Sequence, residues 1–172
     1  MFLLALCCVY TIRQWKSLLG LITAFTIGHS LTLALSVLDV ISISPPLVEF
    51  LIPLTILATC IHTIYNRNNP QPGNFKLRYA MVLLFGFIHG LGFSTLLKSL
   101  LGKNENILSP LFAFNTGLEA GQLLIVAAVL LFLVALTSIC RIKKSSLVFF
   151  ISLAVSGIAF WLALQRFFEL IK

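Results

Sequence analysis

The sequence contains few charged residues. Only 10% of its 172 residues are charged and only five are acidic, whereas an average soluble domain is about 25% charged. The longest polar stretch, residues 66–78, is far too short to form a soluble domain. Because 59% of the residues are hydrophobic, we expect residues 1–172 to form a single integral membrane domain in a lipid bilayer.

Several catalytic motifs are also absent from the sequence. It has no nucleotide-binding loop, no H-E-x-x-H, no G-x-S-x-G and no C-x-x-C pair, so nothing in it indicates an enzyme. Its four cysteines, Cys7, Cys8, Cys60 and Cys140, lie within or at the ends of apolar segments. We expect them to be packed thiols.

The apolar residues predict an all-α fold. A membrane-spanning helix needs about 20 mostly apolar residues, and charged, proline and glycine residues divide the chain into about six such segments. The predicted bundle is therefore polytopic, with a short first helix. The segments are 1–11, 18–38, 46–66, 79–101, 111–138 and 146–168.

The net charge of +7 is spread over separate loops, which argues against a nucleic-acid partner. Eight of the twelve basic residues fall in alternate loops, and such loops are usually cytoplasmic. We therefore expect a bacterial inner-membrane protein with both termini outside. The eight are Arg13, Lys16, Arg67, Lys76, Arg78, Arg141, Lys143 and Lys144.

Four ionisable residues lie inside the predicted spans: His29, Glu49, His89 and Glu119. Such groups are costly in hydrocarbon and usually serve a function there. Both histidines fall near mid-membrane, ten or eleven residues into segments that run outward. Glu119 falls in the outer half and Glu49 near the outer surface. The sequence thus predicts one polar layer and a metal or proton site.

Other polar residues support part of this layer. Asn115, Glu119 and Gln122 are spaced i, i+4, i+7 and share one helix face. Imidazole suits Ni, Cu, Zn and Fe, and a carboxylate adds charge compensation. Two alternatives stay open. The histidines could be neutral and bonded to hydroxyls such as those of Ser30 and Thr32, and Glu49 could face the headgroup region.

Glycine spacing predicts where helices meet. Gly86 and Gly90 form one G-x-x-x-G and Gly117 and Gly121 form another, and such pairs allow close packing. A short loop joins the two helices, so we expect them to pack and to bring His89 near Glu119.

A short internal similarity also links the two histidines. The pattern F-x-x-x-H-x-L occurs at residues 25–31 and again at 85–91. Each histidine segment is followed by a returning segment that carries a glutamate. The chain could thus contain a parallel repeat of two helical hairpins, and membrane transporters often place their binding sites between repeats.

Four motifs make the chain similar to a known family. FTIGHSLTL, PPLVEFLIPLTI, FGFIHGLGFS and FNTGLEAGQL resemble the HupE/UreJ family of hydrogenase and urease accessory membrane proteins. The resemblance covers nearly the whole chain and implies a helical bundle that handles Ni²⁺ or a similar divalent metal. It extends to His29, Glu49, His89, Asn115, Glu119 and Gln122, with Ser30 and Thr32 as neighbours.

The family typically has a further histidine and an Asp-His pair before a segment like FLLAL. This chain begins near the end of that stretch, so we expect the natural domain to start upstream.

Three functions are consistent with these observations. The first is a permease or accessory protein for a divalent metal, nickel preferred, in which His29 and His89 ligate while Glu49 and Glu119 offset charge or take protons. The second is a b-type haem protein with His29 and His89 as axial ligands. The third is a structural or partner-binding membrane subunit. The sequence leaves homo-oligomers and partners in metalloenzyme maturation open.

Overall fold

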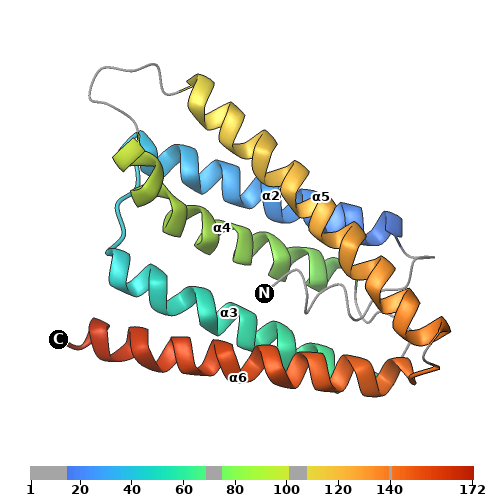
Figure 1. Ribbon diagram of the computed structural model, residues 1–172. Coiled ribbons are helices and arrows are strands. Elements are labelled where there is room, and N and C mark those ends of the chain that lie inside the picture. Colours follow the sequence, from blue (N-terminus) through green and yellow to red (C-terminus); the bar gives the residue numbers. More distant parts are fainter. Residues whose placement is uncertain (1–14, 69–74, 101–107, 140) are drawn as a thin grey trace.

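The computed structural model describes residues 15–68, 75–100, 108–139 and 141–172 (Figure 1). These residues contain five helices, each long and apolar enough to cross a membrane, which confirms the all-α transmembrane prediction. The expected short helix at 1–11 lies outside the described residues. The five are α2 Trp15–Val37, α3 Pro45–Tyr65, α4 Phe75–Leu100, α5 Leu108–Ser138 and α6 Lys144–Leu170.

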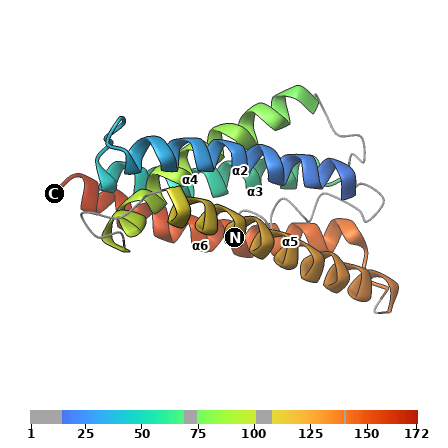
Figure 2. The same cartoon turned by 90° about the horizontal axis from the view of Figure 1, so that it is seen from above.

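Successive helices run in opposite directions, in the spatial order α5, α2, α4, α3, α6 (Figure 1). Viewed from above, α5 runs beside α2 on one side of the bundle (Figure 2). The starts of α2, α4 and α6 and the ends of α3 and α5 all lie at one end (Figure 1). Lys16, Arg67, Arg78 and Arg141 therefore share that end, as their alternate spacing predicts.

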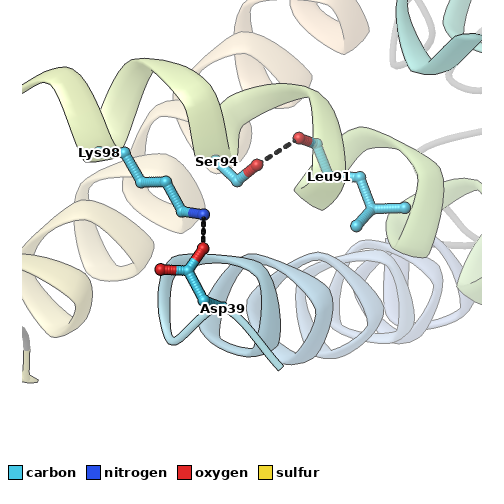
Figure 3. A network of polar contacts seen from close by, with 4 residues as sticks. All are labelled: Asp39, Leu91, Ser94 and Lys98. Carbon is cyan, nitrogen blue, oxygen red and sulfur yellow. Dashed lines mark hydrogen bonds and ion pairs between the residues drawn. The ribbon is translucent and has the colours of Figure 1, made fainter. Parts of the chain in front are cut away.

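At the opposite end, Asp39 reverses the chain after α2. Its φ of 57° is left-handed, a conformation that aspartate tolerates better than most residues. The amides of Val40 and Ile41 donate to the Leu35 carbonyl and close the helix end. The Asp39 carboxylate also accepts from Lys98 Nζ at 2.5 Å (Figure 3), so this turn links α2 to α4.

Helix α3 begins with two prolines, Pro45 and Pro46, after Ser44. Proline suits the first helical turn, where its missing amide hydrogen removes no helical bond. A third proline, Pro53, lies buried inside the helix, which continues past it to Tyr65. Nearby, Thr55 Oγ1 donates to the Ile52 carbonyl at 2.7 Å.

The closest helix contact joins α2 and α4 through three glycines. A Cβ at Gly86 would collide with the Phe25 carbonyl oxygen, and one at Gly90 with the His29 carbonyl and Thr32 Oγ1. On the α2 side, a Cβ at Gly28 would meet the Leu83 carbonyl oxygen at 2.5 Å. Only glycine allows the two backbones to come this close.

This contact corrects the expectation that Gly86 and Gly90 pack against α5. Their groove receives α2, which has its own glycine, Gly28, at the contact. No described atom lies within 4 Å of a Cβ built at Gly117 or Gly121.

Helix α3 packs mainly against α6 and also contacts α4, so it joins the two halves of the bundle. Thr55, Thr59 and Thr63 on α3 are buried, as is Ser152 on α6. Thr59 Oγ1 donates to the Thr55 carbonyl at 2.8 Å. Such back-bonding satisfies a hydroxyl within its own helix.

The two G-x-x-x-G pairs provide a matched test of this packing. We expect Gly86→Ala to destabilise the protein by about 1–3 kcal/mol, the usual cost of overpacking, because the obstructing atom belongs to the α2 backbone. Gly117→Ala should change stability by less than about 0.5 kcal/mol. Thermal unfolding of both variants in one detergent makes the comparison. Equal loss in the two variants would contradict the glycine-mediated α2–α4 contact.

Candidate functional site

His29 is the most deeply buried of the described histidine and acidic residues. Its side chain is 1% exposed, and its carbonyl lies against Gly90 of α4. Neither Nδ1 nor Nε2 has a hydrogen-bond partner among the described residues. A buried polar group without a partner costs about 1–3 kcal/mol. His29 is therefore held in a costly state that a ligand would relieve.

Three phenylalanine rings surround the His29 imidazole. Phe25 and Phe114 stack on it with centroid distances of 6.0 and 6.3 Å, and Phe93 meets it edge-on at 5.5 Å. The rings come from α2, α5 and α4, so three helices form this apolar enclosure. The rings offer no lone pair to the imidazole nitrogens.

His89 lies on α4 and contacts the same Phe25 ring. Its Nδ1 is 2.8 Å from the Phe85 carbonyl oxygen, and its ring is 5.2 Å from the Phe25 ring. A carbonyl only accepts, so Nδ1 carries the hydrogen and Nε2 of the neutral ring carries the lone pair. Such a bond to a carbonyl also orients metal-ligating histidines.

The two histidines lie at matching positions along their helices. Each is fourteen residues after the first residue of its helix, Trp15 or Phe75, which corresponds to about 21 Å. Because α2 and α4 run in the same direction and pack together, the imidazoles share one level, with Phe25 in contact with both.

Glu119 lies at a different place, in a pocket between α2 and α5. The pocket has a volume of about 420 Å³. Residues of α2 between Thr23 and Leu31 form one wall, and the half-buried Glu119 of α5 lines the pocket as well. Its lining residues are Thr23, Thr26, Ile27, Ser30, Leu31 and Glu119.

The two polar residues that share a face of α5 with Glu119, Gln122 and Asn115, have different surroundings. Gln122 is buried, and its Oε1 lies 3.1 Å from Thr26 Oγ1. Asn115 has a buried Oδ1 without a partner among the described residues. The predicted stripe of Asn115, Glu119 and Gln122 thus lies along the part of α5 that passes α2.

Glu49 takes part in an ion-pair network near the start of α3. Its Oε2 is 3.0 Å from Nη1 of Arg166 on α6, and the same Nη1 is 2.6 Å from Glu169 Oε2. Both Glu49 and Arg166 are partly exposed. The observed contact of the Glu49 carboxylate is therefore with a guanidinium group.

Neither of the hydroxyls expected to satisfy His29, those of Ser30 and Thr32, bonds to its ring nitrogens. Thr32 Oγ1 donates to the Phe87 carbonyl at 2.8 Å, across the α2–α4 contact. Ser94 Oγ donates to the Leu91 carbonyl at 2.7 Å (Figure 3). Ser30 lines the Glu119 pocket. A neutral His29 bonded to one of these hydroxyls is therefore not the observed arrangement.

The predicted layer is thus divided into three places: the two histidines around Phe25, Glu119 in its pocket, and Glu49 beside Arg166. Within the described ranges, no three His, Cys, Asp or Glu side chains are close enough together to hold a metal ion. The described residues offer two imidazoles here, fewer than the four ligands of a closed structural metal site.

Sequence reasoning did not single out Phe93, Phe114 or Arg166. Phe25 belongs to the F-x-x-x-H pattern, and Phe93 lies four residues after His89, so both share a helix face with a histidine. Phe114 and Arg166 come from helices whose contacts depend on long-range packing. Nothing local in the sequence indicates their partners.

The five long apolar helices define a polytopic membrane protein, and His29 and His89 lie inside its spans. The model of the HupE / UreJ protein family matches residues 1–166, so the chain belongs to this family, as its motifs predicted. The family is associated with nickel transport and is not an enzyme family. No curated protein and no solved structure matches the chain.

The Nδ1 contact predicts the tautomer of His89. Nitrogen NMR of the histidine-labelled protein at neutral pH should show His89 protonated at Nδ1, because the Phe85 carbonyl can only accept. Replacing His89 with glutamine assigns its signal by loss. A ring protonated only at Nε2 would contradict the observed contact.

Proposed function

We propose that this protein carries a divalent transition-metal cation, nickel preferred, across the membrane, and that His29 and His89 bind the cation on its way. The proposal rests mainly on the fully buried His29 imidazole, whose two nitrogens have no partner among the described residues. Membership of a family associated with nickel transport supports the choice of metal.

The chemistry of the histidines fits this cargo. Neutral imidazole binds Ni, Cu, Zn and Fe well, whereas Mg and Ca prefer oxygen ligands. The hydrogen bond from Nδ1 to the Phe85 carbonyl leaves the lone pair of the neutral His89 ring on Nε2. The surrounding phenylalanines exclude water and strengthen electrostatic interactions with a bound ion.

A site with two protein ligands also suits transport. A transported ion must bind well enough to enter and loosely enough to leave, whereas a closed four-ligand site retains its metal. The described residues provide no group of three ligands, so release from the imidazoles does not require a cage to open. Glu119 on α5 offsets part of the positive charge of the cargo.

The predicted haem function is less well supported. Axial histidines need space between them for a porphyrin, but the α2 and α4 backbones touch at Gly28, Gly86 and Gly90. The Phe25 ring also contacts both imidazoles. An absorption spectrum of the purified protein without a Soret band would agree with the cation proposal.

Replacing His29 distinguishes a role in metal binding from a role in stability. We expect His29→Leu to lower Ni²⁺ affinity at least about tenfold while leaving the melting temperature equal or higher, because an apolar side chain removes an unsatisfied buried group. Isothermal titration in lipid nanodiscs and thermal unfolding measure the two effects. His89→Leu should likewise lose Ni²⁺ affinity.

His62→Leu is the matched control, since His62 lies near the other end of α3 and should leave Ni²⁺ affinity unchanged. Lower stability with unchanged Ni²⁺ affinity in His29→Leu would instead favour a structural role. Uptake of Ni²⁺ into proteoliposomes, present in the wild type and absent in His29→Leu, tests transport itself.

The charged ends of the bundle indicate its orientation. Lys16, Arg67, Arg78 and Arg141 share one end, which we place in the cytoplasm of a bacterial cell. The C-terminus lies at the other end. A C-terminal alkaline phosphatase fusion should therefore be active and a C-terminal green fluorescent protein fusion dark. The reverse pattern would contradict this orientation.

A further inference from the structure

Basic residues gather at one end of the bundle, where α3 ends and α6 begins (Figure 1). Arg67 comes shortly after the last residue of α3. Arg141, Lys143 and Lys144 lie at the start of α6. These four residues, called the basic patch below, are all exposed.

The sequence provides no carboxylate close to the basic patch. The acidic residues of the chain are Asp39, Glu49, Glu105, Glu119 and Glu169. None of them falls in the α3–α4 connection or in the α5–α6 connection, and three of them form ion pairs at the opposite end of the bundle. The charge of the patch therefore complements an anion that the two connections do not supply.

Two contacts hold the end of α3 against the start of α6. Ser145 Oγ donates to Asn68 Oδ1 at 2.6 Å, and the Arg67 guanidinium lies 4.9 Å from the centroid of the Phe149 ring. A cation and an aromatic ring attract each other at such a distance. The contacts place Arg67 beside the basic residues of α6, so the patch belongs to two packed helices.

Exposed apolar and aromatic side chains adjoin the basic patch. Ile61 and Tyr65 lie exposed in the last turns of α3, and Phe150 lies exposed in the second turn of α6. Tyrosine is typical of the interface between membrane and water, and basic side chains extend toward the headgroups there. The charges and the apolar side chains together match an amphipathic partner.

We propose that the basic patch binds the headgroup of an anionic phospholipid, whose acyl chains lie along the exposed apolar residues of α3 and α6. Both helices span the membrane, so their ends lie at the level of the lipid headgroups. Basic sites between spanning helices bind such headgroups in other membrane proteins. Lipid binding of this kind requires neither cation transport nor a particular orientation of the chain.

Native mass spectrometry of the full chain in a mild detergent tests the proposal. The protein is titrated with phosphatidylglycerol or with phosphatidylcholine of the same acyl chains. The wild type should bind its first phosphatidylglycerol at least about tenfold more tightly than phosphatidylcholine, because each basic contact contributes about fivefold. Equal affinity of the wild type for the two lipids would overturn the proposal.

Two variants locate the binding. Lys143→Gln and Arg67→Gln should each lower the affinity for phosphatidylglycerol about fivefold and leave the affinity for zwitterionic phosphatidylcholine unchanged. Arg67→Lys keeps the charge and should lose less affinity than Arg67→Gln. The lysine variant, like Lys143→Gln, also covers the case in which Arg67→Gln does not fold. Unchanged phosphatidylglycerol affinity in folded Lys143→Gln or Arg67→Gln would overturn the proposal.

Two further variants are matched controls, since each also removes one exposed positive charge. Lys16→Gln lies at the same end of the bundle on α2, and Lys172→Gln lies at the C-terminus at the other end. Both should bind phosphatidylglycerol like the wild type. A loss in Lys16→Gln equal to that in Lys143→Gln would contradict a site at the basic patch.

Glycerol phosphate distinguishes a lipid from a soluble anion. It carries a phosphate group without acyl chains, so at equal concentration it should not displace phosphatidylglycerol from the wild type. Displacement would show that the patch serves a soluble phosphate compound, and would overturn the assignment to a lipid.

Discussion

The contact between the α2 and α4 backbones determines where the rest of the site lies. In lipid, helices gain little from burying apolar side chains against each other, so close van der Waals packing and small residues become decisive. Gly28, Gly86 and Gly90 allow that packing here. The contact brings two parallel helices together, and each carries its histidine fourteen residues after its first residue. His29 and His89 therefore lie at one level, both in contact with Phe25.

This packing also explains how the protein tolerates His29. An unsatisfied imidazole costs about 1–3 kcal/mol, and nearby hydroxyls could have offset that cost. They are used elsewhere, because Thr32 bonds across to the Phe87 carbonyl and so strengthens the α2–α4 contact. The hydroxyl beside His29 thus stabilises the helix contact, while the imidazole has no hydrogen-bond partner among the described residues. Departures from full polar satisfaction are expected at functional sites.

The spans could be predicted from the sequence because hydropathy is a local property. The predicted segment 18–38 and the observed Trp15–Val37 differ by a turn at most. Helix pairing could not be predicted, because the sequence does not show which helix packs against each G-x-x-x-G motif. Gly86 and Gly90 meet α2, whereas Gly117 and Gly121 meet no described atom. The ion pair of Glu49 with Arg166 likewise depends on the packing of α3 against α6, two helices far apart in the sequence.

Helix α2 is the element that the histidine pair and the pocket beside Glu119 share. Phe25 and His29 are four residues apart and take part in the histidine pair, while Thr26 and Ser30 are also four apart and line the pocket. A helix turns about 100° per residue, so adjacent i, i+4 pairs lie on adjacent faces of one rod. A single rigid helix therefore carries the imidazole on one face and the hydroxyls of Thr26 and Ser30 on the adjacent face. This separation follows from the one-residue offset of the two pairs.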